Sequence, residues 1–415
     1  MDNGRITKTR SLIDKGVIIP FPADVRIGDD VDPGMIAPGV VIHPGCRITG
    51  KTTSIQTGTI LGAQGPVTLA DCQTGRDVEL GGGFFSRSVF LDRSAVSADA
   101  QVRDACILEE ETAGAHSVKL GHTVLLPFAT LGSHIDFCDC LLAGGTDKKN
   151  HSEVGSSFMH FNITPNRDRA APSLLGDVPR GVMLAERPIF LGGQGGLVGP
   201  AIIEYGTVTS AGTIVRGDIT EHGKLVFDNH PRPAMRDFRP GIYWEITRRV
   251  RNNLLFIANL VALRAWYVFA RSEFFGSGGM EQALLRGALE KIDMSLDERI
   301  GRLGELAGNM PESIHEYQHL MGKATRRTLI AQERELFEKW GRMSGMLRSL
   351  KSCTGDEQER DAFLSRLASL REAGRGYIET VRGFDAETRQ SGTRWLQGVV
   401  NRIADSVYVT IPSFR

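Results

Sequence analysis

The feature that most constrains this chain is a run of apolar residues that recurs at every sixth position. Eleven of the thirteen residues at this spacing are hydrophobic, whereas a hydrophobic content of 41% gives about five by chance. A period of six matches neither the 3.6-residue repeat of a helix nor the two-residue alternation of a strand. It is typical of short strands joined by tight turns, with one side chain in each six pointing inward. The thirteen positions are Ile36, Ile42, Ile48, Ser54, Ile60, Pro66, Cys72, Val78, Phe84, Phe90, Val96, Val102 and Leu108.

Three such six-residue segments can close one triangular coil, and stacked coils bury a continuous apolar column. The chain has 48 glycines in 415 residues, and glycine, Asp and Asn between the inward positions can supply the corners. The pattern resumes, shifted in phase, at Ile202, Val208 and Ile214. We therefore predict a parallel β-helix over residues 21–240, preceded by an N-terminal arm at 1–20.

The six-residue pattern is interrupted at residues 142–200, the least regular and most polar part of this region. It contains the segments GGTDKKNHSEVG and HFNITPNRDRAAPS. We expect a loop-rich insertion here, and loops that interrupt a rigid scaffold are where binding groups usually lie.

The pattern becomes helical after the proline-containing segment NHPRPAMRDFRPG (229–241). We predict an α-helical domain over residues 241–415, because apolar residues there recur at three and four positions. The helices are expected near 243–272, 280–306, 312–350 and 357–405. The apolar stretch 254–270 contains Arg264 and is more typical of a buried helix than of a membrane span. This half carries no nucleophile, metal or phosphate motif, so we expect it to assemble or cap the β-helix.

Composition narrows the classes of partner and compartment. The chain has 49 Lys+Arg against 49 Asp+Glu, and this balance argues against a nucleic acid partner. The first residues form no signal peptide and the six cysteines are scattered, which favours a soluble cytoplasmic protein. Cys138 and Cys140 lack the spacing of a structural zinc site, so we predict no metal.

Six-residue repeats of this kind resemble those of the left-handed parallel β-helix superfamily, most of whose members are acyltransferases that act as trimers. Three segments also resemble the acetyltransferase domain of the bifunctional uridyltransferase/glucosamine-1-phosphate acetyltransferase family. They are AGGTDKKNHSEVG (143–155), NITPN (162–166) and TVTSAGTIVRGD (207–218). The resemblance implies a left-handed coil, a homotrimer and acetyl-CoA or another acyl-CoA as co-substrate. The implied acceptor is a sugar phosphate or a nucleotide sugar such as UDP-N-acetylglucosamine.

The resemblance carries over to individual positions. Asn166 matches the family's loop asparagine, which helps bind acetyl-CoA, and Asp168 matches its loop aspartate. The family's general-base histidine corresponds to Gly145, and its sugar-binding tyrosine corresponds to Lys148. The nearest histidine to that position is His151.

Histidine is the usual base for acyl transfer because its pKa lies near working pH. Of His134, His151 and His160, we select His151 first and His160 second as catalytic residues. The substrate-binding candidates are Asn162, Asn166, Arg167, Asp168 and Lys148. The candidates for binding the acyl-CoA are Asn166, Gly193 and Gly195. The guanidinium of Arg167 suits a phosphorylated ligand, whereas the two glycines allow close approach of either a ligand or a neighbouring coil.

Two function classes therefore remain open. The first is a hexapeptide-type transferase that moves an acyl group from a CoA thioester to an amino- or hydroxyl-sugar phosphate or nucleotide sugar. The second is a non-catalytic nucleotide-sugar-binding or scaffolding protein that keeps the coil without the chemistry. Gly145, at the position of the family's base, favours the second.

Overall fold

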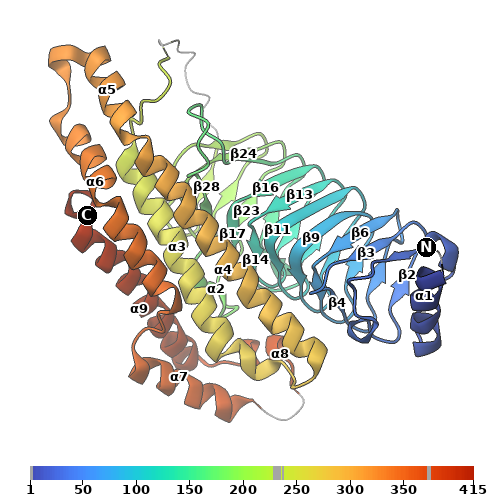
Figure 1. The fold of residues 1–415 in the computed structure, drawn as a ribbon. Coiled ribbons are helices and arrows are strands. Elements are labelled where there is room, and N and C mark those ends of the chain that lie inside the picture. Colours follow the sequence, from blue (N-terminus) through green and yellow to red (C-terminus); the bar gives the residue numbers. More distant parts are fainter. Residues whose placement is uncertain (1–2, 228–234, 236–237, 372–374) are drawn as a thin grey trace.

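A parallel β-solenoid followed by a helical region makes up the protein (Figure 1). The computed structural model describes residues 3–227, 235, 238–371 and 375–415. The predicted β-helix followed by a helical region is confirmed. Most of the proline-containing segment that was expected to end the coil lies outside the described residues.

Three ladders of parallel strands form the solenoid, and we call them faces A, B and C. Face A contains β1 (Arg26–Ile27), β3 (Arg47–Thr49), β6 (Val67–Ala70), β9 (Gly83–Phe90), β11 (Ala100–Leu108), β13 (Val118–Gly121), β16 (Ile135–Cys138), β21 (Met159–Phe161), β24 (Gly196–Val198) and β27 (Ile214–Val215). Face B contains β2 (Val41–Ile42), β5 (Ile60–Leu61), β8 (Glu79–Leu80), β10 (Ala95–Val96), β12 (Ala113–Gly114), β15 (Thr130–Leu131), β20 (Glu153–Val154), β23 (Phe190–Leu191), β26 (Val208–Thr209) and β28 (Leu225–Val226). Face C contains β4 (Ser54–Ile55), β7 (Gln73–Thr74), the last residues of β9 and β11, β14 (Val124–Leu125), β17 (Cys140–Leu142), β22 (Ser173–Leu175) and β25 (Ala201–Ile203).

The inward positions do not follow a strict six-residue count. Where three equal segments would place Ile60 beneath Ile42, the ladder pairs Ile42 with Leu61, which is fully buried. In the same way Phe85 points inward and Phe84 is 40% exposed. The predictions that Ile60, Pro66 and Phe84 face inward are therefore wrong. The second run is also displaced by one residue, with buried Ile203, Thr209 and Val215 in place of Ile202, Val208 and Ile214.

The corrected register gives a direct test. We expect Leu61→Ala to lower the free energy of unfolding by about 2–5 kcal/mol, because it leaves a cavity in the apolar column. Ile60→Ala removes an outward, half-buried side chain and should cost less than about 1 kcal/mol. Urea unfolding followed by circular dichroism measures both. A larger loss for the Ile60 variant would contradict this register.

The corners of the coils use the left-handed backbone region, as the composition predicted. Gly39 and Gly58 have φ of 79° and 76°, and Asp77 and Asp139 have φ of 55° and 60°. Glycine adopts this region without steric cost, and Asp tolerates it better than most residues. The glycine content therefore follows in part from the number of corners.

The predicted N-terminal arm contains helix α1 (Asn3–Lys15), which lies at the first coil (Figure 1). Lys8 Nζ donates to the carbonyls of Gly28 and Asp29 at 2.9 and 2.7 Å. Lys15 Nζ donates to the Ile36 carbonyl at 2.8 Å. The helix thus binds open carbonyls at the end of the solenoid, which would otherwise face only solvent.

The segment 142–200 is not one loop, because the solenoid continues through it. Strands β20 to β24 keep their places in the three ladders. The extra residues form three excursions: the hairpin of β18 (Gly145–Asp147) with β19 (Asn150–His151), a loop at 162–172, and a segment containing α2 (Val178–Gly181).

The helices of the C-terminal region begin and end close to the predicted limits, but the two longest predictions are divided. The helices are α3 (Ile246–Phe269), α4 (Gly279–Gly308), α5 (Met310–Met321), α6 (Arg327–Ser349), α7 (Glu357–Leu370), α8 (Tyr377–Arg382) and α9 (Ala386–Thr410). The predicted helix at 312–350 is interrupted at Gly322, where φ is 50°. The prediction at 357–405 corresponds to α7, α8 and most of α9.

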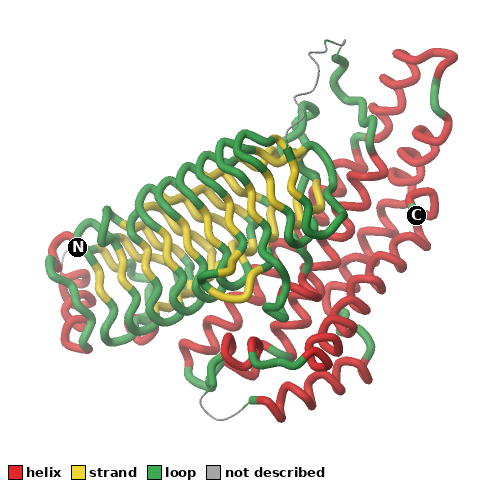
Figure 2. Tube along the Cα trace, turned by 180° about the vertical axis from the view of Figure 1, so that it is seen from behind, coloured by secondary structure: helices red, strands yellow, loops and turns green. Residues whose placement is uncertain are grey.

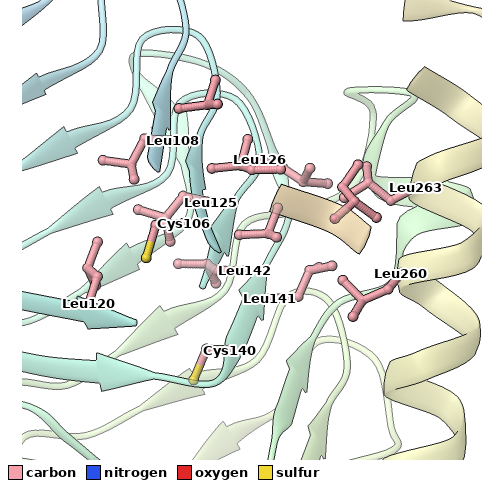
Figure 3. Packing of buried hydrophobic residues seen from close by; sticks show 14 of the residues in the cluster. Cys106, Leu108, Leu120, Leu125, Leu126, Cys140, Leu141, Leu142, Leu260 and Leu263 are labelled. Carbon is pink, nitrogen blue, oxygen red and sulfur yellow. The ribbon is translucent and has the colours of Figure 1, made fainter. Parts of the chain in front are cut away.

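The helical region packs on face C. Helix α4 contacts β4, β7, β9 and β11, and α3 contacts β22. Figure 3 shows Leu126 and Leu141 of the solenoid facing Leu260 and Leu263 of α3. Figure 2 shows from behind that the opposite side of the solenoid is left uncovered by these helices.

Helix α3 is long and apolar enough to cross a membrane, the one such helix found in the described part of the chain. Of its apolar window, 78% is buried inside the protein. Arg264, the charged residue within the apolar stretch 254–270, pairs with Asp293 of α4 at 2.8 Å. Within this fold α3 is a core helix, as the sequence predicted.

Candidate functional site

The hairpin β18–β19 leaves the solenoid between faces C and B and carries the first-choice catalytic residue. It begins at Gly145, where φ is +103°. A Cβ at this position would lie 2.6 Å from both the Asn150 carbonyl oxygen and the His151 Cα. Because neither backbone atom can move without opening the hairpin, a histidine does not fit at residue 145.

His151 lies at the end of the hairpin with one ring nitrogen fixed. Its Nδ1 is 2.8 Å from the Lys148 carbonyl oxygen, which can only accept a hydrogen bond. The contact therefore assigns the proton of the neutral ring to Nδ1 and leaves a lone pair on Nε2. Nε2 lies 3.9 Å from a Glu153 carboxylate oxygen, and the side chain is 22% exposed. This geometry suits a base that removes a proton at Nε2.

A cavity of about 390 Å³ lies beside this hairpin. We call it the hairpin cavity. Its cationic groups are Lys148 and Lys149 from the hairpin and Arg382 from α8. The two ion pairs here are long: Lys148 is 3.6 Å from Glu111, and Arg382 is 3.6 Å from Asp147. The hydrogen bond from the Lys149 backbone N–H lowers the pKa of Asp147. The cavity therefore holds cations that an anionic ligand can bind.

His160, the second-choice catalytic residue, lies in the buried column of face A. Nδ1 is 2.6 Å from the Cys138 carbonyl oxygen, and Nε2 is 2.8 Å from Ser173 Oγ. Because Nδ1 donates to that carbonyl, Nε2 of the neutral ring accepts from the Ser173 hydroxyl, whose oxygen also accepts the Ala201 N–H at 3.1 Å. Burial lowers the pKa of His160. With both nitrogens bonded and the side chain 2% exposed, the geometry favours a structural role over proton transfer.

This environment predicts a pH effect on stability. Above pH 6.5 the ring is neutral in both the folded and the unfolded state. Below pH 6.5 only the unfolded state takes up the proton, so the free energy of unfolding decreases as the pH is lowered. We expect the difference in unfolding free energy between wild type and His160→Gln to shrink by up to about 1.4 kcal/mol per pH unit below 6.5. Urea titrations at pH 8.0 and 5.5 measure it.

Burial raises the pKa of both Glu109 and Glu333 to about 7. These two groups therefore make the free energy of unfolding increase as the pH is lowered, which is opposite to the effect of His160. Both carboxyl groups are present in the two proteins, so their effect cancels in the comparison. Parallel pH curves for wild type and variant would contradict a neutral buried His160.

The loop that carries most of the predicted substrate residues docks against the helical region. Asn162 Nδ2 donates to Asp139 Oδ2 at 2.6 Å. Asn166 Nδ2 donates to the Ile242 carbonyl at 3.1 Å, and its Oδ1 accepts the Gly241 N–H at 2.8 Å. Both groups of the Asn166 amide are therefore occupied by the segment that leads into the helices.

Asp168 is also buried in this contact. It accepts hydrogen bonds from the Thr164 hydroxyl and, at 3.2 Å, from the Tyr243 hydroxyl. Arg249 of α3 lies 3.8 Å from its other oxygen. Arg167, unlike Asn166 and Asp168, is exposed. Of the predicted substrate residues, Lys148 and Arg167 are thus the two with exposed cationic groups.

Gly193 and Gly195 lie at a corner between faces B and A. A Cβ on Gly193 would lie 2.8 Å from the Ser156 carbonyl oxygen, and one on Gly195 would lie 2.8 Å from that of Thr213 in the next coil. Close packing of neighbouring coils accounts for both glycines. Their role in acyl-CoA binding remains a prediction.

Lys148 and His151, both predicted from the sequence, lie on one hairpin. The residues of the helical region that face this hairpin were not predicted. Ile378 and Arg382 come from α8, a helix of six residues. A helix this short has no clear periodic pattern, and its position depends on contacts with distant residues. No cluster of three or more potential metal ligands occurs among the described residues.

Comparison with known proteins finds similarity to bifunctional GlmU proteins over slightly more than half of the chain. No family model matches it. The chain is 27% identical to the bifunctional protein GlmU of Thermotoga petrophila over 216 residues, which cover 52% of this chain and 43% of that protein. It is 28% identical over 230 residues to the GlmU of Kineococcus radiotolerans, covering 54% and 42%. The GlmU of Mycobacterium bovis is 26% identical over 245 residues, covering 58% and 44%.

The chain thus aligns with less than half the length of these relatives. The six-residue repeat and the three-faced solenoid agree with this similarity. Together they fit a hexapeptide-repeat protein related to GlmU.

Proposed function

We propose that the chain transfers an acyl group from a CoA thioester to an amino or hydroxyl group of a sugar phosphate or nucleotide sugar. The observation that carries the proposal is the similarity to the bifunctional protein GlmU over about half the chain, together with the solenoid. His151 on the hairpin offers a base, and the hairpin cavity offers cations of the kind that bind a phosphate. Acetyl-CoA is the first donor to test.

In the proposed reaction His151 Nε2 removes a proton from the acceptor as its nitrogen or oxygen attacks the thioester carbonyl. The tetrahedral intermediate then collapses, the C–S bond breaks, and the proton from His151 goes to the CoA thiolate. Glu153, whose oxygen lies 3.9 Å from Nε2, would stabilise the protonated ring. A positioned base of this type contributes about 10²–10⁴-fold to the rate.

The phosphate of the acceptor would bind to Lys148, Lys149 and Arg382. The existing ion pairs of Lys148 and Arg382 are 3.6 Å long, so a phosphate can compete with Glu111 and Asp147. Lys149 Nζ makes no ion pair with any residue that the structure describes. Charge-assisted hydrogen bonds to a phosphate are stronger than these exposed contacts.

The proposed assembly is a homotrimer in the cytoplasm. Faces A and B carry exposed apolar side chains, including Met159 and Phe161 on face A and Phe190 and Leu225 on face B. The helices do not cover these faces, which leaves them for contacts between subunits (Figure 2). The contacts of Asn166, Gly193 and Gly195 with the acyl-CoA stay predictions within this scheme.

Release of CoA thiol tests the function. Purified protein is mixed with acetyl-CoA and either glucosamine 1-phosphate or UDP-linked amino sugars, and free thiol is followed with a chromogenic disulfide. We expect release that depends on both donor and acceptor. Release that is independent of every acceptor, or none at all with any of them, would contradict the transferase.

The second candidate is a non-catalytic protein that binds nucleotide sugars. Two observations favour it: a histidine does not fit at Gly145, and the Asn166 amide is engaged by the Gly241–Ile242 backbone. Calorimetry separates the two functions. A transferase should bind both acetyl-CoA and UDP-N-acetylglucosamine, whereas a binding protein should bind the nucleotide sugar alone.

A further inference from the structure

A second cavity, of about 370 Å³, lies between the solenoid and the helical region. We call it the interdomain cavity. The solenoid contributes Gln56, Leu91 and Glu110, and the other wall includes Arg271 and Phe275. Its volume falls within the range of about 300–1,000 Å³ that is usual for small-molecule sites.

Two charged residues that line this cavity, Arg271 and Glu110, make fewer hydrogen bonds than their polar atoms allow. Arg271 lies in the short 3-10 helix η3 (Arg271–Phe274) and is 1% exposed. Its Nη2 donates to Glu110 Oε1 at 2.7 Å, but Nε and Nη1 bond to no described residue. Glu110 Oε2 is equally without a partner there. Two donors and one acceptor of this ion pair, which belong to residues lining the cavity, are therefore left without a partner among the described residues.

Buried polar groups normally have partners, and each unmade bond of this kind costs about 1–3 kcal/mol. The guanidinium of Arg271 cannot turn away to find one, because it stacks 3.7 Å from the centroid of the Tyr377 ring. The Tyr377 ring therefore fixes the guanidinium beside the cavity.

The lining of the cavity carries three cationic side chains and four carboxylates, which are Arg76, Arg93 and Arg271 and Asp92, Glu110, Glu281 and Glu379. Arg76 pairs with Glu281 at 3.3 Å, Arg93 with Glu111 at 2.8 Å, and Arg271 with Glu110. No excess of cations remains to attract a phosphate. A neutral ligand can use the free donors and the acceptor without disturbing these pairs.

We propose that the interdomain cavity binds a neutral polyhydroxylated ligand of the size of a mono- or disaccharide. A hydroxyl group both donates and accepts, so adjacent hydroxyls can bond Arg271 and Glu110 at once. Phe274, Phe275 and Ile378 provide the apolar surface on which the carbon face of a sugar ring packs.

The interdomain cavity adjoins the hairpin cavity but differs from it in its charged groups. Ile378 lines both cavities, and Glu111 pairs with Arg93 on one side and with Lys148 on the other. Three cationic side chains and two carboxylates line the hairpin cavity, whereas carboxylates outnumber cationic side chains in the lining of the interdomain cavity. Binding of a neutral sugar here does not depend on the proposed acyl transfer.

The test is saturation-transfer NMR and calorimetry on the full chain with glucose, N-acetylglucosamine and cellobiose. Glucose 1-phosphate is the charged comparison, and glycerol is the control for weak polyol contacts. Gln56→Trp fills the cavity, since Gln56 is 5% exposed, lines it, and its side chain bonds to no described residue. Gln101→Trp, on the exposed side of β11, is the matched control.

We expect at least one neutral sugar to bind wild type and Gln101→Trp equally, and Gln56→Trp at least tenfold more weakly. If Gln56→Trp does not fold, as judged by circular dichroism, Phe275→Leu replaces it and should weaken binding several-fold. Absence of binding by every neutral sugar, or equal binding by the cavity variant, would overturn the proposal. Binding of the phosphorylated sugar alone would overturn it as well.

Discussion

His151→Gln is expected to lower the rate of acyl transfer by about 10²–10⁴-fold, because the variant has no group that can take up the acceptor's proton. Glutamine keeps a side-chain donor near the Lys148 carbonyl, which now bonds His151 Nδ1, so the hairpin should retain its shape. The affinity for the sugar phosphate should change little, since Lys148, Lys149 and Arg382 remain. Steady-state kinetics at saturating acetyl-CoA measure kcat and KM separately.

The matched control is His116→Gln. His116 is an exposed histidine on another corner of the solenoid, where it contacts Ser133 and the ring of His134. Its loss should leave kcat within about twofold. Equal kcat values for His151→Gln and the control would exclude His151 as the base and leave the binding function as the better explanation.

Arg299→Met is expected to produce the largest loss of stability. Arg299 of α4 is 1% exposed and its Nη2 lies 2.8 Å from Asp139 Oδ1, while its Nη1 donates to the Arg169 carbonyl at 3.1 Å. Removing the guanidinium leaves a buried carboxylate at the contact between solenoid and helices. Breaking one side of such a pair costs about 3–5 kcal/mol. Denaturant unfolding gives the value.

Arg302→Met on the same helix is the control. Arg302 pairs with Glu298 and Glu305 but is 27% exposed, so its loss should cost less than about 1 kcal/mol. Adding Asp139→Asn to Arg299→Met should restore part of the stability, because the unpaired charge is removed. Equal losses for the two arginine variants would show that the Asp139 contact contributes no more than a surface pair.

The sequence predicted the solenoid well because each coil repeats one local requirement, an inward apolar residue followed by a corner. It predicted the register less well at Ile60 and Phe84. In both places the next residue, Leu61 or Phe85, is also apolar, and coils of unequal length decide which of the two faces inward. A fixed count of six cannot choose between them.

The residues of the candidate site also fall into two groups, those that a local sequence pattern places and those that distant contacts place. His151 and Lys148 are seven residues or fewer from Gly145, so a local pattern could place them together. The burial of His160 depends on Cys138 and Ser173, and the partners of Asn166 lie about 75 residues further along the chain. These contacts follow from the stacking of coils and the docking of helices, which local sequence patterns do not encode.

The packing of α4 on face C sets a limit on how this solenoid can change in length. Gly287 lies against Gln73 beside β7, and Arg299 binds Asp139 just before β17. Twelve helical residues separate the two contacts, which is about 18 Å. Four ladder steps separate β7 from β17 on face C, which is about 19 Å. A solenoid without a docked helix can gain or lose a repeat. Here an added coil between β7 and β17 would move Gln73 and Asp139 apart, so that α4 could no longer contact both. Helix and coil number can therefore change only together, as an insertion of about three helical residues for every coil.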